Sequence, residues 1–335
     1  MSKLKVAVLM GGNSSERDIS LWTGRQIVEA LDPAKYTIYA LDTATGRKLL
    51  DGSYAVGELT YRHGNELTPI NSLIELPLAD DNSKPDVVFI ALHGPGGEDG
   101  TVQGMLEVLN LPYTGSKVLA SALAMDKAMT KRVLTAGGIR MPADITLKGA
   151  DDIRRSELRS ITLPLVIKPN TQGSTIGMTV VRDLDDLDAA LEKAFDLDNT
   201  VILEQFVEGV EISVPVLGND ILEVLPAVEI LPKSGFYDYE AKYTAGATEE
   251  ICPARLSAAV SEEAARLAQL SHELLGCRGM SRTDMIVDSA GRPWVLEVNT
   301  IPGMTPYSLL PLSAKVAGYS FAGLLDRIIE LALEK

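Results

Sequence analysis

The chain has few cysteines, no long apolar run and a deficit of positive charge, and each of these absences excludes a class of protein. Only Cys252 and Cys277 occur, with no CxxC pair and no histidine at ligand spacing beside them, so neither a disulfide framework nor a zinc site is supported. The apolar run after Lys3 and Lys5 is too short for a signal peptide, and no segment approaches the length of a membrane span. The expected location is therefore the cytoplasm, and both cysteines are expected to be buried thiols.

The charge balance and the missing phosphate-loop motifs narrow the class further. The formal net charge is −15, which argues against partners such as nucleic acid or an anionic membrane, because both need clustered Lys and Arg. Neither GxxxxGK[ST] nor GxGxxG occurs in the chain. Hydrophobic residues make up 46% and charged residues 23%, as in soluble enzymes, and 335 residues suffice for two or three packed units.

Apolar runs that alternate with helical patterns predict an N-terminal α/β unit with a parallel sheet. Its strands are expected at residues 5–10, 36–42 and 86–92, and its helices at 19–31 and 101–109. Residues 43–85 show weak periodicity and are interpreted as a peripheral insertion. The first domain is placed at residues 1–118.

The remaining patterns predict a helix, a small α+β unit and a third, larger unit. The helix is expected at 116–138, with Lys127 in its middle, and the small unit has strands at 164–168 and 178–181 and a helix at 183–195. A strand at 201–206 opens the third unit, followed by strands at 211–217 and 223–230 and helices at 257–275 and 321–333. The expected domain ranges are 119–203 and 204–335.

Two alternating runs, 281–287 and 292–299, predict a hairpin with one apolar and one charged face. A turn centred on Ala290-Gly291 pairs Thr283 with Val298, Met285 with Leu296 and Val287 with Trp294 on the core face. The other face then pairs Asp284 with Glu297 and Arg282 with Asn299. The two carboxylates would sit ~5 Å apart and repel each other by ~3 kcal/mol at an effective dielectric of about 20. Carboxylate and amide oxygens beside an arginine suit Mg²⁺ that carries a phosphate; a solvated polar face is the alternative.

A second candidate site is the glycine loop after the strand at 164–168. Gly173-Ser174-Thr175 offers free backbone N–H groups and hydroxyls, and Lys168 closes the apolar strand just before it. This combination suits a triphosphate. The alternatives are a plain hairpin loop and a lysine whose ammonium group reaches out to water.

Two polar residues follow N-terminal strands at the edge where open α/β sheets bind ligands. Glu16 comes after Gly11-Gly12 at the end of the first strand, and His93 ends the strand at 86–92. We expect them to converge there, although Glu16 can also complement the helix dipole as a first-turn residue. His63 and His272 are expected at the surface.

The third unit carries two further candidates. Glu204 and Glu211 bracket a turn between strands, where carboxylates can hold an adenine amino group and ribose hydroxyls; exposed turn acids are the alternative. The aromatic loop at 236–243 suits a lid over a reaction that excludes water, or else a surface loop tucked onto the core.

Taken together, these motifs resemble the D-alanine–D-alanine ligases of the ATP-grasp superfamily over the whole chain. The matching segments are residues 11–16, 93–104, 112–115, 168–169, 173–177, 237–243, 281–284 and 297–303. The resemblance implies an α/β fold of three domains, the first Rossmann-like, the others α+β ATP-grasp domains. It implies the ligation of two D-alanines to D-alanyl-D-alanine through a D-alanyl phosphate, for peptidoglycan precursor synthesis, and a homodimer.

The same resemblance implies the ligands and roles of individual residues. ATP would be bound by Lys127, Lys168, Glu204, Phe206, Val207 and Glu211. Two Mg²⁺ ions, which Mn²⁺ can replace, would be bound by Asp284, Glu297 and Asn299, with Glu297 bridging them. The substrate residues would be Glu16 and His93 near the first ammonium group, Ser174 and Tyr243 linked to Glu16, Arg282 and the Gly303 backbone on the oxyanion, Ser308 on the second carboxylate, and Lys242 on the phosphates.

The second substrate and catalytic competence leave alternatives. Tyr243 favours the dipeptide over the depsipeptide with D-lactate, and says little about D-serine. A nucleotide-binding sensor without turnover would be expected to lose Arg282, Glu297 or Asn299, and all are present. Thr175 stands where the family usually has a second serine, and Met285 where phenylalanine is frequent.

Overall fold

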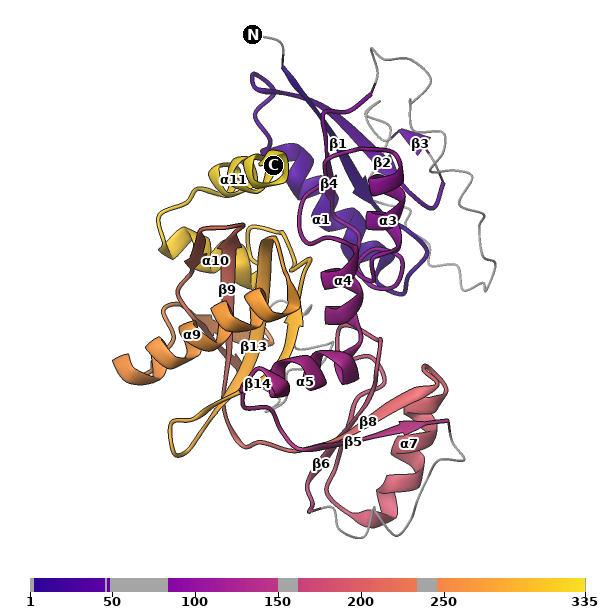
Figure 1. Cartoon of the computed structure of the whole chain (residues 1–335), viewed down its shortest axis with the longest axis vertical. Coiled ribbons are helices and arrows are strands. Elements are labelled where there is room, and N and C mark those ends of the chain that lie inside the picture. The colour runs from indigo at the N-terminus through magenta and orange to yellow at the C-terminus, as the bar shows by residue number, and fades with distance from the viewer. Residues whose placement is uncertain (1–2, 46, 49–83, 150–161, 234–245, 335) are drawn as a thin grey trace.

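The computed structural model describes residues 3–45, 47–48, 84–149, 162–233 and 246–334. Across these ranges the strands form three sheets. The N-terminal and central sheets lie towards opposite ends of the molecule's longest axis, and the C-terminal sheet lies between them (Figure 1).

The N-terminal sheet has the order β3-β2-β1-β4. Its strands are β1 (Leu4–Met10), β2 (Tyr36–Asp42), β3 (Arg47–Lys48) and β4 (Val87–Ile90), and its helices are α1 (Arg17–Ala30) and α3 (Thr101–Val108). The predicted parallel sheet is confirmed, because β1 pairs in parallel with both β2 and β4. Alternate residues of β1 pack into different cores, Val8 with α1 and Leu9 with α3, so helices cover both faces.

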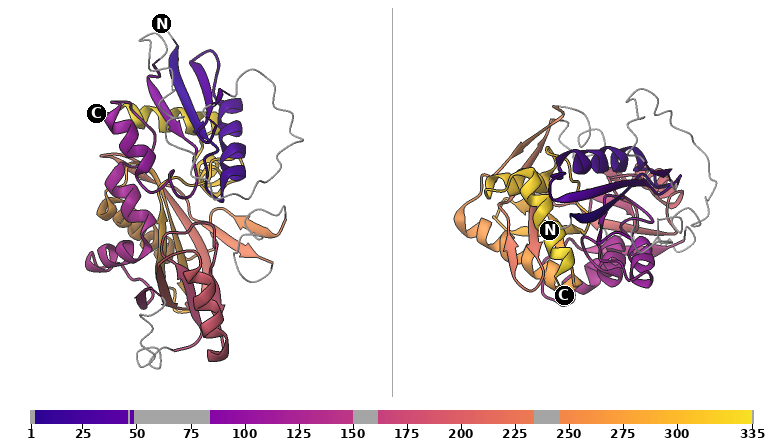
Figure 2. Two further views of the ribbon diagram at one scale, coloured as in Figure 1. Left: turned by 90° about the vertical axis from the view of Figure 1, so that its right-hand side faces the viewer. Right: turned by 90° about the horizontal axis from the view of Figure 1, so that it is seen from above.

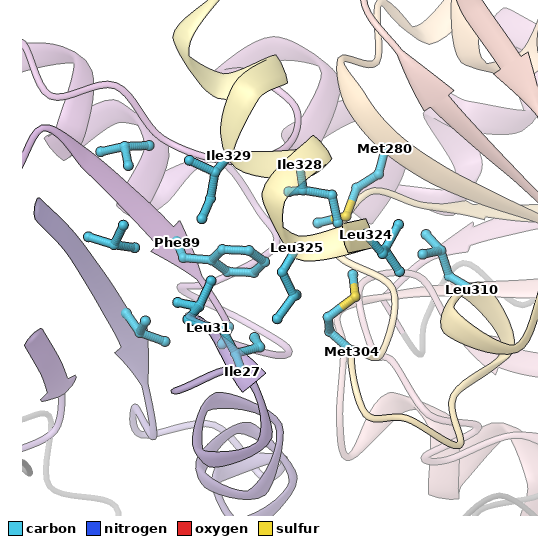
Figure 3. Close-up of a cluster of buried hydrophobic side chains, with 14 of the residues drawn as sticks. Ile27, Leu31, Phe89, Met280, Met304, Leu310, Leu324, Leu325, Ile328 and Ile329 are labelled. Carbon is cyan, nitrogen blue, oxygen red and sulfur yellow. The ribbon is translucent and has the colours of Figure 1, made fainter. Parts of the chain in front are cut away.

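The C-terminal helix α11 (Phe321–Leu333) joins the first and last parts of the chain. It lies as predicted, with Ser320 as its N-cap. Its residues Leu325 and Ile329 are fully buried against Phe89 of β4 and Ile27 of α1 (Figure 3). This shared core fixes the N-terminal unit against the C-terminal sheet, and hence fixes the site between them.

The central sheet is antiparallel, in the order β5-β8-β6-β7. Its elements are β5 (Asp144–Lys148), β6 (Leu165–Pro169), β7 (Thr179–Val181), β8 (Thr200–Gln205), the short helix η2 (Leu184–Asp186) and α7 (Leu187–Phe195). The prediction that the strand at 201–206 opens the third unit is wrong. β8 is an inner strand of this sheet, between β6 and β5, and β5 escaped prediction because its polar ends hide the pattern.

The C-terminal sheet has six strands, in the order β12-β11-β9-β13-β14 with β10 beside β9. They are β9 (Gly209–Gly218), β10 (Leu222–Val224), β11 (Val228–Pro232), β12 (Thr248–Ile251), β13 (Gly279–Asp288) and β14 (Pro293–Asn299). The predicted strand at 223–230 is two strands, because Pro226 interrupts it. Helix α9 (Ala258–Leu275), capped by Ser257, covers one face; α10 (Leu309–Val316), which was not predicted, follows β14. The β11–β12 hairpin projects from the sheet (Figure 2).

The predicted helix at 116–138 is two helices, α4 (Val118–Met125) and α5 (Lys127–Ala136). Asp126 separates them with an extended backbone, and its carboxylate accepts the N–H of Met129 at 2.9 Å. Lys127 is therefore the first residue of a helix rather than the middle of one. Both helices pack in the core under β9, β13 and β14, together with α9.

The cysteine prediction holds for one residue of the pair. Cys277 is buried and Cys252 is half-buried, and both are free thiols. Burial raises the pKa of the Cys277 thiol to about 12. None of the helices within the described ranges is both long and apolar enough to cross a membrane.

Candidate functional site

The hairpin of β13 and β14 brings the predicted charged residues together. Asp284 pairs with Glu297 and Arg282 with Asn299, as the alternation predicted. Arg282 donates from Nε and Nη2 to the two oxygens of Asp284 at 2.9 and 2.8 Å, and the Ser213 hydroxyl donates to Asp284 at 2.5 Å. Two guanidinium nitrogens of Arg282 on β13 and the hydroxyl of Ser213 on β9 therefore hold the Asp284 carboxylate in place, and the guanidinium neutralises its charge.

A β-bulge follows this pair, so part of the predicted register is wrong. Met285 pairs with Val295 rather than Leu296, and Val287 pairs with Pro293 rather than Trp294. Val295 is fully buried in the core, whereas Leu296 lines a cavity on the opposite face. A bulge re-aims one side chain without changing the composition of the strand, which is why period-two alternation did not reveal it.

Glu204 of β8 lies at the centre of a buried cluster of charged side chains. Lys168 Nζ lies 2.7 Å from one carboxylate oxygen and Lys131 Nζ lies 2.5 Å from the other. Burial favours the neutral acid, but the two ammonium groups outweigh it and hold the pKa of Glu204 below its usual value. Lys168 is 7% exposed and its ammonium group donates to Glu204, so the interpretation in which it reaches out to water is wrong. Glu204 is 3% exposed, so the interpretation as an exposed turn acid is also wrong.

The larger of two neighbouring cavities lies between the central and C-terminal sheets and has a volume of about 760 Å³. The predicted ATP ligands all line it: Lys127, Lys168, Glu204, Phe206, Val207 and Glu211. Arg182 stacks over the Phe206 ring at 5.4 Å. Ser174 and Thr175 in the glycine loop have φ of 48° and 65°, a left-handed turn that directs the loop backbone along the cavity wall. The shape and the mixed lining suit a nucleotide.

The smaller cavity, of about 200 Å³, lies where the N-terminal unit meets the hairpin. Its lining includes the predicted substrate residues Glu16, His93, Ser174, Arg282, Gly303 and Ser308, and the predicted metal ligand Asn299. The two cavities share Lys127, Gly173, Ser174 and Glu297. Lys127 Nζ is 3.7 Å from Glu297 and donates to the carbonyl of Gln172 at 2.7 Å, so one lysine links the glycine loop to the acidic hairpin.

Glu16 and His93 converge in the smaller cavity as the strand ends predicted. The Ser174 hydroxyl donates to the Glu16 carboxylate, joining the glycine loop to the first helix. His93 Nε2 lies 3.3 Å from the Thr23 hydroxyl, and its Nδ1 lies 3.8 Å from Glu98. Glu16 is the N-cap residue of α1 but its side chain makes no capping hydrogen bond there, so its carboxylate can complement the helix dipole and still face the cavity.

Other predictions fall outside the described residues or are corrected. Lys242, Tyr243 and His63 lie outside them, as do the aromatic loop and most of the predicted insertion. His272, predicted at the surface, is 1% exposed on the inner face of α9. Its Nδ1 lies 2.7 Å from the Ser281 hydroxyl, and burial lowers the pKa of the imidazole to about 4.

Two site residues were missed by reasoning from sequence. Lys131 lies four positions after Lys127, the spacing of one helix face, and this signal was available. Glu250 of β12 lines the smaller cavity. Burial raises the pKa of its carboxyl, although the nearby Arg282 opposes the shift; nothing in the short run of β12 distinguishes it from a surface acid.

The hairpin's donor set can be compared with what a divalent cation requires. Among the described residues, no group of three or more His, Cys, Asp or Glu side chains could hold a metal ion by itself. Asp284, Glu297 and Asn299 instead offer two carboxylates and an amide on adjacent strands. Mg²⁺ is usually held by one or two carboxylates, with waters and substrate phosphates completing the octahedron. The donor set fits Mg²⁺ bound together with a nucleotide.

A nucleotide-sized cleft between two largely antiparallel sheets, beside a parallel-sheet unit, defines an ATP-grasp protein. The sequence of residues 5–116 matches the family model of the D-ala D-ala ligase N-terminus, and residues 139–330 match the family model of the D-ala D-ala ligase C-terminus. The D-alanine–D-alanine ligase of Pelotomaculum thermopropionicum is 43% identical, covering 99% of this chain and 97% of the relative. That of Syntrophobacter fumaroxidans is 44% identical, covering 99% and 98%. The chain therefore belongs to the D-alanine–D-alanine ligase family.

Solved structures agree with this assignment. The D-alanine–D-alanine ligase of Bacillus anthracis complexed with ATP has a TM-score of 0.81 and 34% identity, covering 98% of this chain and 97% of that one. The VanG D-Ala:D-Ser ligase of Enterococcus faecalis has a TM-score of 0.79 and 33% identity, covering 99% and 100%. The predicted fold class is confirmed.

Proposed function

We propose that this chain catalyses the ATP-dependent ligation of two D-alanines to D-alanyl-D-alanine, with release of ADP and phosphate. The observation that carries the proposal is the shared wall of the two cavities: Lys127, Ser174 and Glu297 line both. A nucleotide in the larger cavity would direct its terminal phosphate at this wall, where a small acid in the other cavity meets it. Such contact is what phosphoryl transfer from ATP to a carboxylate requires.

In the first step a carboxylate oxygen of the first D-alanine attacks the γ-phosphorus, and the bond to ADP breaks. Glu16 is our candidate to bind the ammonium group of this substrate, with His93 beside it. Ser174 holds the Glu16 carboxylate in place through the hydrogen bond described above. Tyr243 is proposed to complete this link. The product of the step is D-alanyl phosphate.

In the second step the amine of the second D-alanine attacks the acyl carbon, loses a proton, and phosphate leaves. Arg282 and the Gly303 backbone are proposed to stabilise the oxyanion that forms; in other acyl-transfer enzymes one such donor contributes about 3 kcal/mol. Both line the smaller cavity. Ser308 is proposed to bind the carboxylate of the incoming substrate; its hydroxyl accepts the Thr305 N–H at 3.1 Å, which fixes its orientation.

The nucleotide is proposed to lie in the larger cavity with its base near Phe206 and Val207. Glu204 and Glu211 would accept from the adenine amino group and the ribose hydroxyls. Lys127, Lys168 and Lys242 would hold the phosphates. Asp284, Glu297 and Asn299 would hold two Mg²⁺ ions, which neutralise phosphate charge when bound; Mn²⁺ is the expected substitute.

The biological setting is part of the same proposal. D-alanyl-D-alanine is a peptidoglycan precursor, so we infer a role in cell-wall synthesis, in the cytoplasm and as a homodimer. The family supports this setting. The first domain range, 1–118, is proposed on the same basis, whereas the expected boundary between 203 and 204 is corrected, because it would divide β8, which belongs to the central sheet.

The test measures phosphate release from ATP and Mg²⁺ with D-alanine, with L-alanine, and with D-alanine plus D-serine or D-lactate. We expect release with D-alanine alone and D-alanyl-D-alanine as the main product by mass. Release only when D-serine or D-lactate is added would move the specificity to another acceptor. No release with any of them would refute the ligase and favour a nucleotide sensor.

A further inference from the structure

Lys131 has no role in the reaction outlined above, yet it lies in the most buried charge cluster of the site. It comes from α5 and meets Glu204 of β8, which also meets Lys168 of β6. Lys131 is 4% exposed and Glu204 is 3% exposed. Asp144 lies 3.4 Å from Lys131 at the outer side of the cluster. Each oxygen of the Glu204 carboxylate thus has a lysine beside it, and the Asp144 carboxylate lies next to Lys131.

The two lysines differ in where they face. Lys168 and Glu204 both line the larger cavity, whereas Lys131 does not. Lys131 also donates to the main-chain carbonyl of Pro142 at 2.7 Å, so its ammonium group is tied to the backbone as well as to Glu204. Lys168 donates to Glu204 alone among the described residues. Lys131 is therefore the fixed partner of Glu204, and Lys168 is the partner that faces the ligand.

This difference matters when an anion enters the cavity. If Lys168 turns towards a nucleotide phosphate, one oxygen of Glu204 loses its cation inside a buried site. A buried carboxylate without a partner is strongly destabilising, so Glu204 alone would hold Lys168 back. With Lys131 in place, the carboxylate keeps one full ion pair, and Lys168 can change partners at a much smaller cost.

We infer that Lys131 is a positioning residue for nucleotide binding: it keeps Glu204 ion-paired and oriented, and so frees Lys168 to bind the phosphates. This inference rests on the proposed function, because it needs a nucleotide in the larger cavity. Lys131 itself is not expected to touch the ligand. Its effect passes through the Glu204 carboxylate, which makes the inference separable from a structural role.

The test is a double-mutant cycle on the full chain, with binding of a non-hydrolysable ATP analogue and Mg²⁺ measured by calorimetry. We expect Lys131→Met to weaken binding and to raise the KM for ATP about tenfold or more, with kcat at saturating ATP and the KM for D-alanine changed less than about threefold. Lys131→Arg should keep binding within about threefold of the unmodified chain. Arg132→Met, on the exposed side of the same helix, is the matched control and should change nothing.

Glu204→Gln provides the readout that a structural role would not affect. Once Glu204 is neutral, nothing holds Lys168 back, so Lys131→Met/Glu204→Gln should bind the analogue as tightly as Glu204→Gln alone. Unchanged binding by Lys131→Met, or an equal loss in both backgrounds, would overturn the inference. Should Lys131→Met not fold, the same comparison is made with Lys131→Gln. If the unmodified chain fails to bind the analogue, the proposed function itself is refuted.

Discussion

Replacing Glu297 by glutamine separates the role of its charge in catalysis from its role in folding. Glu297 faces Asp284 across the ladder. Arg282 pairs with Asp284 at 2.8 Å, so little remains of the ~3 kcal/mol of repulsion that two unpaired carboxylates would have there at a dielectric of about 20. Lys127 lies 3.7 Å from Glu297 and attracts it, by ~4 kcal/mol at the same dielectric. The Glu297 side chain is 35% exposed, so water screens both interactions. Because an exposed ion pair contributes little to stability, Glu297→Gln should change the free energy of unfolding by no more than about 1 kcal/mol.

Turnover should respond very differently. If Glu297 helps to hold cations beside the transferring phosphate, glutamine lacks the negative charge that would hold them. The value of kcat should then fall about a thousandfold or more, or ~4 kcal/mol in barrier height. D-alanine-dependent phosphate release measures kcat, and urea unfolding measures stability. Glu192→Gln, on the exposed face of α7, is the matched control with unchanged values of both. A Glu297→Gln variant with turnover within threefold of the unmodified chain would refute the reasoning.

Further predictions concern the substrate contact, a buried histidine and the shared core. Ser174→Ala removes the hydrogen bond to Glu16 and should lower kcat/KM for D-alanine about ten- to a hundredfold; Ser174→Thr should recover part of it. Burial lowers the pKa of the His272 imidazole to about 4, whereas its pKa in the unfolded chain is about 6.5. As the pH falls below 6.5, the unfolded chain takes up this proton before the folded chain does, so the free energy of unfolding decreases. Urea unfolding between pH 7 and pH 5 should show that this residue lowers the free energy of unfolding by about 2 kcal/mol, a loss that is absent in His272→Gln. Equal dependence of stability on pH in the unmodified chain and in His272→Gln would contradict this prediction. Leu325→Ala should cost about 2–5 kcal/mol, measured by urea unfolding, because Leu325 is fully buried between α11 and the N-terminal sheet.

The sequence predicted well wherever local pattern alone decides the structure. The helix at 321–333 and the strand at 36–42 have the predicted bounds, because the helical period of the one and the mostly apolar run of the other are uninterrupted. The facing pair of Asp284 and Glu297 was also predictable, since a slip of one residue would have buried charges.

What could not be predicted depends on contacts distant in sequence. Leu296 is the bulged residue, left without a partner between Glu297 and Val295. The place of β8 in the central sheet follows from its pairing with β6 and with β5, whose polar ends give no clear strand signal. His272 has polar neighbours along its helix, yet its face of α9 packs on the sheet. The spacing from Lys127 indicates that Lys131 lies on the same helix face, but its ion pair with Glu204 depends on a strand distant in sequence.

The most direct test of the central claim follows oxygen atoms. D-alanine labelled with ¹⁸O in its carboxylate is supplied with ATP and Mg²⁺, and both the dipeptide and the inorganic phosphate are analysed by mass. The account predicts D-alanyl-D-alanine and one labelled oxygen in phosphate for each dipeptide formed, because the attacking carboxylate oxygen leaves with the phosphoryl group. Dipeptide with unlabelled phosphate would contradict the acyl phosphate, and phosphate without dipeptide would contradict the ligation.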